Sequence, residues 1–163
     1  MPRSAVLGRI PTRKLVRYGA IAAVAYALGT VQVPRLIQRR YGSEPVTDHF
    51  DLEWGEGKSI RFNAAGSTTV EVTTTAWLGV ATALLDMSKS VVPVLVLRRA
   101  YPGQHLDALW ASAATIGQML PPQHGFRGGR GEAMLTGTAL ALDPLSVPVS
   151  VAISQVVGIY VLR

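Results

Sequence analysis

The seven residues from Gly125 to Gly131 combine the residue types best suited to hold an anion. Four of them are glycines and two are arginines. Glycine lets backbone N–H groups approach an anion closely, because no Cβ atom stands in the way. Arginine adds planar, paired donors that match the oxygens of a phosphate. The predicted phosphate-binding residues of this loop are Arg127, Gly128, Gly129, Arg130 and Gly131.

Other interpretations of the same loop are weaker or less specific. The loop lacks the Lys-Ser/Thr ending of a nucleotide-binding P-loop. An RNA-binding Arg-Gly-Gly segment normally contains many copies of the motif, and only one is present here. The remaining alternative is a flexible basic loop that touches lipid headgroups.

A second small cluster, Gly66-Ser67-Thr68, directly precedes an apolar segment. Hydroxyl residues beside a glycine at the start of a helix can hold an anion there, so all three residues are predicted to bind a phosphate group. The alternative is an ordinary helix N-cap.

Asp86 and Lys89 lie inside the apolar segment 72–97. Their spacing of three residues places them on one face of a helix. Charges within a membrane span are costly and usually face a partner or a water-filled cavity. A purely structural, self-neutralising pair is the alternative to a functional role.

The composition indicates the kind of fold that must position these residues. Of the 163 residues, 48% are hydrophobic and only 16% are charged. A soluble domain carries about 25% charged residues. The charges are also clustered, which leaves long stretches almost without them. We therefore predict an all-α fold: a polytopic integral membrane bundle with short or broken helices.

The expected organisation is a basic leader at residues 1–17 and a membrane domain at residues 18–163. About 20 helical residues are needed to cross the hydrocarbon core of a bilayer. The expected spans cover residues 18–37, 72–97, 106–120, 134–142 (short) and 146–162. A signal peptide with Ala25-Tyr26-Ala27 as its cleavage site is the alternative for the first apolar segment.

Residues 38–71 are polar and are predicted to be a loop on the water side, in which glycines and a proline break regular structure. Pro93 is predicted to kink the helix that contains it. Basic residues flank the first apolar segment, which indicates headgroup anchoring rather than nucleic-acid binding. Lysine and arginine divide seven against seven between the two sides, so charge does not assign the sidedness.

The sequence excludes several kinds of site. It has no cysteine, which rules out disulfides, thiolate nucleophiles and cysteine-based zinc sites. His49, His105 and His124 lie far apart in the sequence and form no metal-binding pair. We expect neither a metal nor a cofactor.

Taken in order, these pieces resemble the bacterial membrane acyl-phosphate:glycerol-3-phosphate acyltransferases over roughly residues 20 to 160. Leu28-Gly29-Thr30 is similar to a Leu-Gly-Ser step in the first helix of that family. Phe62 to Val70 aligns with the first loop of the family, and Asp86-Met87-Ser88-Lys89 with its Asp-x-x-Lys-Gly helix. Gly117 to Pro121 and Gly125 to Gly131 align with Gly-His-x-Phe-Pro and Gly-Phe-Lys-Gly-Gly-Lys-Gly, which is the most specific match.

The sequence also departs from the family. Phe62, Ala64 and Val72 stand where the family has serine, asparagine and arginine. Gln118 replaces a histidine, and Arg127 and Arg130 replace lysines, which keeps the charge but changes the donor geometry. The closing His/Asn/Arg motif has no counterpart before Arg163, which indicates either a fragment or an incomplete active site.

The resemblance implies an acyl transfer in the bacterial cytoplasmic membrane. The sn-1 hydroxyl of glycerol-3-phosphate attacks an acyl phosphate, phosphate leaves, and lysophosphatidate forms for phospholipid synthesis. Arg130 and Lys89 are the expected catalytic residues, and His124 matches no family histidine. The expected partners are glycerol-3-phosphate, acyl phosphate and membrane lipids. An activated acyl donor needs positioning and charge stabilisation rather than a strong nucleophile.

Two other functions compete with this one. A non-enzymatic homologue would keep the fold and bind anionic lipid or a protein partner, and the lost serine, asparagine and arginine favour it. A transporter or assembly factor is the third possibility, but the sequence shows no second polar cluster across the spans.

Overall fold

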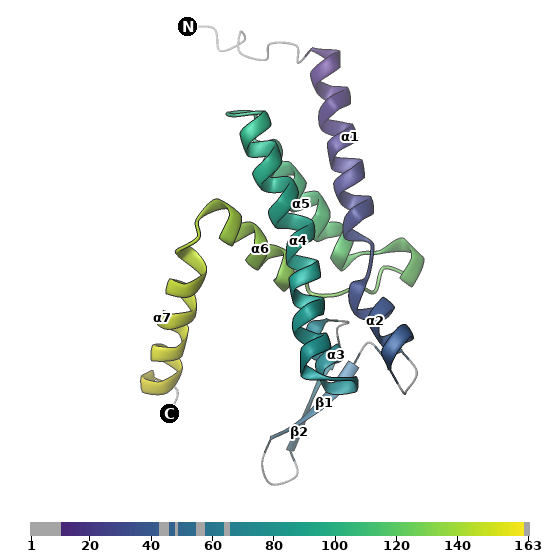
Figure 1. Cartoon of the computed structure of the whole chain (residues 1–163), viewed down its shortest axis with the longest axis vertical. Coiled ribbons are helices and arrows are strands. Elements are labelled where there is room, and N and C mark those ends of the chain that lie inside the picture. The colour runs from purple at the N-terminus through teal and green to yellow at the C-terminus, as the bar shows by residue number, and fades with distance from the viewer. Residues whose placement is uncertain (1–10, 43–45, 48, 55–57, 64–65, 162–163) are drawn as a thin grey trace, which may run out of the picture.

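The computed structural model describes residues 11–42, 46–47, 49–54, 58–63 and 66–161. It contains seven α-helices, a short 3-10 helix and one two-stranded hairpin within these ranges (Figure 1). The elements are α1 (Thr12–Gly29), α2 (Val33–Tyr41), β1 (His49–Trp54), β2 (Lys58–Asn63), α3 (Ser67–Thr73), α4 (Ala76–Ala100), α5 (Leu106–Met119), η1 (Pro122–His124), α6 (Glu132–Leu142) and α7 (Ser146–Val161). The predicted all-α class is confirmed, and the hairpin is a small addition to it.

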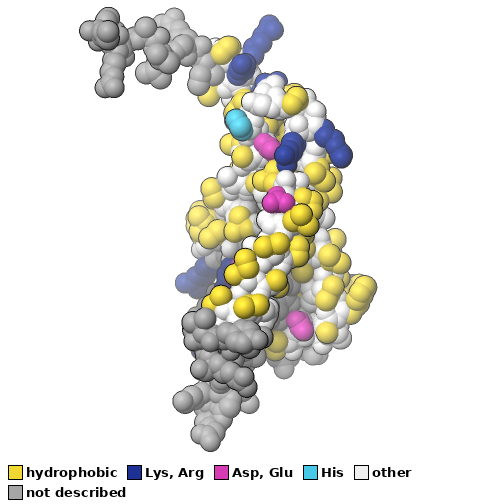
Figure 2. Space-filling model, turned by 90° about the vertical axis from the view of Figure 1, so that its left-hand side faces the viewer, with side chains coloured by type: hydrophobic (Ala, Val, Ile, Leu, Met, Phe, Trp, Pro, Cys, Tyr) yellow, Lys and Arg dark blue, Asp and Glu magenta, His cyan; other side chains and the backbone are white. Residues whose placement is uncertain are grey.

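Two helical stretches are long and apolar enough to cross a membrane, Thr12–Tyr41 and Ala76–Ala100. α6 and α7 are shorter apolar helices. Many large apolar side chains of these helices are exposed, as expected where lipid rather than water surrounds a protein. In Figure 2 such side chains cover much of the visible surface along the body of the molecule.

The core of the bundle lies where α1, α4, α5 and α6 meet. Its buried residues are Ala25, Val94, Trp110, Ala111, Ala114 and Met134. Small residues bring the backbones together: a Cβ atom at Gly29 would lie 2.0 Å from the carbonyl oxygen of Ala114. A Cβ atom at Gly117 would lie 2.2 Å from the carbonyl oxygen of Tyr26. This close approach is how membrane helices gain packing energy without a hydrophobic driving force.

The first half of the chain differs in two details from what the sequence led us to expect. The first apolar segment is not one continuous helix, because α1 ends at Gly29 and α2 begins at Val33. Pro34 occupies the first turn of α2, where its missing N–H group has no helical partner to lose. The segment 38–71 is not without regular structure, since it holds the end of α2, the antiparallel hairpin of β1 and β2, and most of α3.

The second half follows the expected pattern more closely. α4 continues through Pro93 to Ala100. α5 ends at Met119, and Leu120 then leads into the two consecutive prolines, Pro121 and Pro122. α7 folds back from α6 and lies to one side of the bundle (Figure 1). Where these helices enter and leave the membrane stays a prediction.

Candidate functional site

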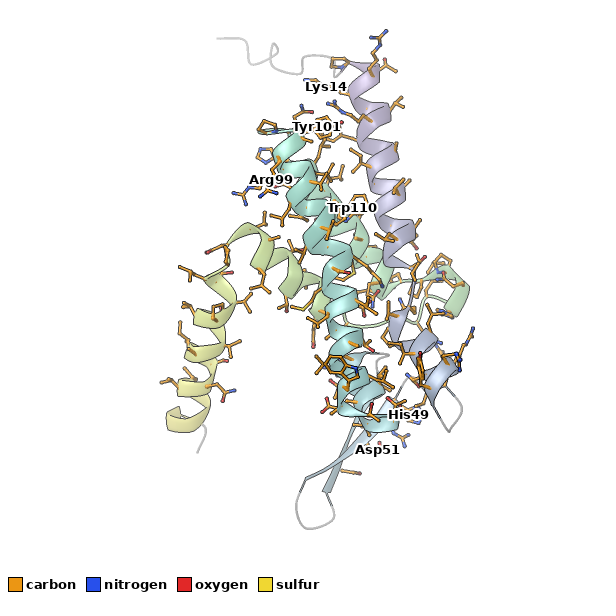
Figure 3. All side chains as sticks on the ribbon, viewed as in Figure 1. Lys14, His49, Asp51, Arg99, Tyr101 and Trp110 are labelled. Atoms are coloured by element: carbon orange, nitrogen blue, oxygen red, sulfur yellow. The ribbon has the colours of Figure 1, made fainter. Side chains whose placement is uncertain are left out.

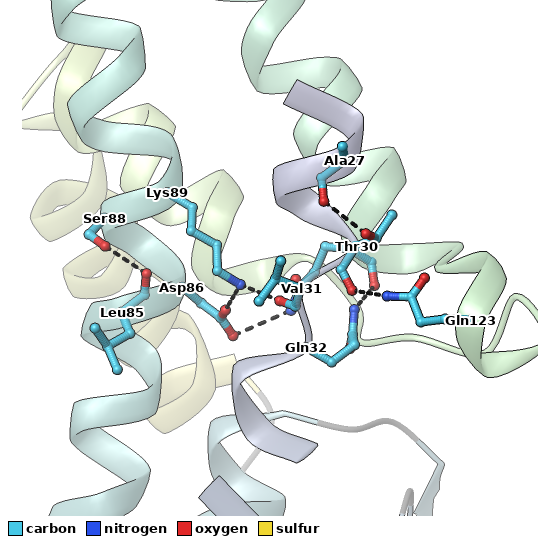
Figure 4. Close-up of polar contacts among 10 residues, drawn as sticks. Ala27, Thr30, Val31, Gln32, Leu85, Asp86, Ser88, Lys89 and Gln123 are labelled. Carbon is cyan, nitrogen blue, oxygen red and sulfur yellow. Dashed lines mark hydrogen bonds and ion pairs between the residues drawn. The ribbon is translucent and has the colours of Figure 1, made fainter. Parts of the chain in front are cut away.

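The site begins at the break between α1 and α2. Residues 30–32 leave the helical path, so their carbonyl groups need partners from elsewhere. Gln123 donates from Nε2 to the carbonyl oxygen of Thr30 at 2.5 Å, and Lys89 donates from Nζ to that of Val31 at 2.5 Å. Figure 4 shows these bonds converging on the break from α4 and from the segment after α5. Side chains from two other segments therefore hold the break in place.

Lys89 also forms a buried ion pair. Its Nζ atom lies 2.6 Å from Oδ1 of Asp86, and the two side chains are only 9% and 5% exposed. A buried charge is tolerated when it is paired and hydrogen-bonded. Here the ammonium group has a carboxylate and a carbonyl as acceptors. Asp86 and Lys89 are thus neighbours, as their spacing predicted.

Gln118 connects this ion pair to the glycine-rich loop. Its Nε2 atom donates to Oδ2 of Asp86 at 3.3 Å. Its backbone carbonyl accepts from Nε2 of Gln32 at 3.0 Å and from the N–H group of Gly129 at 3.1 Å. Gln118 and Gln32 are 4% and 3% exposed, so these bonds lie inside the protein. One residue at the end of α5 therefore joins α4, the α1–α2 break and the loop.

The glycine-rich loop folds back on the end of α5. The N–H group of Gly128 donates to the carbonyl oxygen of Met119 at 3.2 Å, as Gly129 does to Gln118. A Cβ atom at Gly128 would lie 2.1 Å from the carbonyl oxygen of Gln118, and Gly131 has a φ of 75°. The glycines are needed for this close contact and turn. The N–H groups of Gly128 and Gly129 are therefore bonded within the protein rather than directed at an anion, contrary to the geometry assumed from the sequence.

The arginines of the loop are its accessible donors. Arg127 is exposed, and its carbonyl oxygen accepts from Nη2 of Arg35 at 2.9 Å. Arg130 is about half exposed and lies 3.5 Å from the carboxylate of Glu132, which is 74% exposed. An exposed pair of this kind contributes little to stability, so it can rearrange around a ligand. Arg35 of α2 and Arg127 of the loop are thus in contact, and Arg130 follows three residues along the loop.

Gly66, Ser67 and Thr68 lie at the start of α3, some distance from Lys89. Gly66 is the N-cap residue, and no side chain caps the helix. The carbonyl oxygen of Ser67 packs near Gly79 of α4, where an added Cβ atom would lie 3.1 Å from it. Ten residues separate Gly79 from Lys89, which corresponds to about 15 Å along a helix. The structure does not bring Ser67 beside Lys89, and a phosphate role for these three residues stays a prediction.

Three participants were missed by reasoning from the sequence alone. Gln118 was noted only as a departure from the family, Arg35 only as one of the basic residues that flank the first apolar segment, and Gln32 not at all. The sequence offers no signal for Gln32, because its partner is a backbone carbonyl 86 residues away. Ala64 lies outside the described residues.

The chain is similar over most of its length to one known protein family. The family model described as glycerol-3-phosphate acyltransferase matches residues 19–162. The glycerol-3-phosphate acyltransferase of Allorhizobium ampelinum is 32% identical over 131 residues, covering 78% of this chain and 57% of the relative. That of Geobacter sulfurreducens is 33% identical over 127 residues, covering 78% of this chain and 59% of the relative.

A solved structure shares the fold. It is the crystal structure of PlsY, an integral membrane glycerol 3-phosphate acyltransferase, in its glycerol 3-phosphate form. The likeness has a TM-score of 0.65 at 21% identity and covers 88% of this chain and 66% of the other. This chain spans about three fifths of the length of the curated relatives. On the match over residues 19–162, the chain belongs to the glycerol-3-phosphate acyltransferase family.

Proposed function

We propose that this protein is a multi-pass protein of the bacterial cytoplasmic membrane that transfers an acyl group from acyl phosphate to glycerol-3-phosphate. The family match over residues 19–162 is the observation that carries the proposal. The two apolar helical stretches support the location. The product would be lysophosphatidate, the first acylated intermediate of phospholipid synthesis.

The reaction balances without a further reactant. The sn-1 hydroxyl oxygen forms a bond to the acyl carbon, and the bond from that carbon to the phosphate oxygen breaks. The hydroxyl proton leaves with the inorganic phosphate. The protein must therefore bring two anions together and stabilise the charge that builds up as phosphate departs.

The exposure of each residue indicates which of these two roles it would have. Arg127 and Arg130 are accessible cations on the loop and would bind phosphate groups. Lys89 is buried and already bonded to Asp86 and Val31, so its part would be to fix the α1–α2 break and to supply positive charge from within. Gln118 would position the glycine-rich loop relative to Asp86 and Lys89.

The test is formation of lysophosphatidate by the purified full chain in detergent, given acyl phosphate and labelled glycerol-3-phosphate. We expect Arg130→Ala to reduce turnover by about 100-fold or more, since one donor that stabilises developing charge contributes that much. Arg40→Ala is the matched control, because Arg40 is an exposed arginine in the last turn of α2. Equal turnover in wild type and Arg130→Ala would contradict the role of Arg130.

A second function has an observation in its favour. The N–H groups of Gly128 and Gly129 are bonded to carbonyl groups of α5, and several family positions carry other residues. A non-catalytic homologue that binds anionic lipid would fit these facts. A folded wild-type sample with no turnover that still binds glycerol-3-phosphate or anionic lipid would favour it.

A further inference from the structure

A hollow lies at the turn from α4 to α5, on the opposite end of α4 from α3 and the hairpin. Its volume is about 570 Å³. The lining residues are Arg98, Tyr101, Pro102, Gly103, His105, Asp107 and Leu142. Sites for small molecules commonly have volumes of about 300–1,000 Å³. The hollow is therefore large enough for a phosphate-bearing headgroup.

The hollow is separate from the proposed acyl-transfer site. Arg98 follows Asp86 by twelve residues in the same helix, which corresponds to about 18 Å along the axis. Figure 3 places Arg99, Tyr101 and Lys14 toward one end of the molecule and His49 and Asp51 toward the other. A ligand in the hollow would not touch the ion pair of Asp86 and Lys89.

Positive charge predominates at this end of the bundle. α1 contributes Arg13, Lys14 and Arg17, and the last turn of α4 contributes Arg98 and Arg99. Two acidic residues oppose these five cations: Asp107 at the start of α5 and Asp143 between α6 and α7. Figure 2 shows lysine and arginine side chains around this end, together with a histidine. The resulting field favours an anion over a neutral or zwitterionic ligand.

The walls of the hollow are fixed by contacts with α1. The Arg17 guanidinium lies over the Tyr101 ring at 5.1 Å, and it also bonds to the side chain of Gln104. Tyr18 donates from its hydroxyl to the carbonyl oxygen of Gln104 at 2.7 Å. Arg98 donates from Nη1 to the carbonyl oxygen of Leu142 at 3.1 Å, which ties α4 to the end of α6. A site held in this way loses little conformational entropy when a ligand binds.

The position of the hollow indicates a lipid rather than a soluble anion. It lies at the ends of both candidate membrane spans, where headgroups are found. Leu142 lines the hollow and is 40% exposed. Val92 and Val96, in the preceding turns of α4, are also exposed. A phospholipid can place its phosphate against Arg98 while its acyl chains lie along apolar surface.

We propose that the hollow at the α4–α5 turn binds the phosphate group of an anionic phospholipid, at a site distinct from that of acyl transfer. Arg98 is the principal donor, because arginine pairs with phosphate through two parallel bonds. Asp107 opposes the binding by its charge. The site would anchor this end of the bundle to headgroups of one leaflet.

The test measures lipid retention by native mass spectrometry on the purified full chain, titrated with phosphatidylglycerol or phosphatidylcholine in mixed micelles. We expect phosphatidylglycerol to be retained preferentially, with binding about tenfold weaker in Arg98→Gln because charged hydrogen bonds are lost. Asp107→Asn should tighten binding, and Arg40→Gln, at the other end of the bundle, should leave it unchanged. Thermal unfolding of each variant shows whether the fold is intact.

Three results would overturn the proposal. These are equal retention of the two lipids, unchanged binding in both Arg98→Gln and Asp107→Asn, and displacement of the lipid by inorganic phosphate, which would indicate a site for soluble anions. If Arg98→Gln does not fold, Asp107→Asn still decides, since only an anionic ligand gains from removal of that charge. Because the readout is binding, the outcome does not depend on whether the protein has acyltransferase activity.

Discussion

Two acid–base pairs in this protein have the same chemistry and opposite surroundings. Asp86 and Lys89 are 5% and 9% exposed and lie between α4 and the α1–α2 break. Asp51 and Arg61 face each other across the hairpin, with Arg61 Nε 2.9 Å from Asp51 Oδ1 and side chains 45% and 62% exposed. The buried pair is bonded to the α1–α2 break and to α5, whereas the exposed pair joins only β1 to β2. Surroundings, rather than the pairing itself, decide how much a charge pair matters.

Removing one partner of the buried pair should have the largest effect. In Lys89→Met the carboxylate of Asp86 stays buried without its cation, and we expect a loss of about 3–5 kcal/mol in the free energy of unfolding. Thermal or denaturant unfolding in detergent measures it. The double variant Asp86→Leu/Lys89→Met should recover much of the loss, because no unpaired charge remains. A single variant as stable as wild type would show that the pair is not buried.

Gly128→Ala should reduce the free energy of unfolding by an intermediate amount, because it disturbs the contact between the loop and α5. The added Cβ atom would lie 2.1 Å from the carbonyl oxygen of Gln118 and 2.6 Å from Cδ of Pro121. Both neighbours are rigid, so we expect a loss of about 1–3 kcal/mol and lower activity.

Gly19→Ala is the control for this variant. Gly19 lies in α1 with no atom near its added Cβ, and alanine is the better helix former there. If Gly128→Ala were as stable and active as Gly19→Ala, the contact between the loop and α5 would not be essential.

Removing the exposed pair of Asp51 and Arg61 should change stability least, and its contribution to stability should depend on pH. The hydrogen bond from Arg61 lowers the pKa of Asp51 below its usual value. A carboxyl group whose pKa is lower in the folded state adds stability above its unfolded pKa and loses it as pH falls through the folded pKa. An NMR titration of Asp51 in wild type and Arg61→Gln measures this directly.

In Arg61→Gln the pKa of Asp51 should rise toward its ordinary value, while the unfolding temperature at neutral pH changes little. High salt should produce a similar shift in wild type, since exposed charges are screened. A large loss of stability in Arg61→Gln would remove the contrast between the two pairs.

The fold was predictable where hydropathy alone decides. α4, α5 and α7 lie close to the apolar segments expected from the sequence. The break at residues 30–32 was not, because hydropathy averages over a window and does not register a change of backbone path. The hairpin was missed although Phe50, Leu52 and Trp54 alternate with polar residues, a period typical of a strand. Gly55 and Gly57 next to this segment favour a loop and mask the alternation.

The candidate site was predictable in its charged residues and not in its connections. The spacing of Asp86 and Lys89 predicted their pairing. Their links to Gln118, Val31 and Gly129 join residues far apart in the sequence through backbone carbonyls, which any residue type supplies. Gly128 and Gly131 do make close approaches, but the neighbour they approach is α5.

The break between α1 and α2 has a consequence for the order in which the protein assembles. α1 can enter the bilayer by itself, since its backbone bonds are internal. The carbonyl group of Val31 acquires its partner only when Lys89 has been made, 58 residues later. That of Thr30 must wait for Gln123, 93 residues later. Until those residues are in place, water is the available partner for the two carbonyl groups. The final placement of the end of the first helix therefore depends on residues from the second half of the chain.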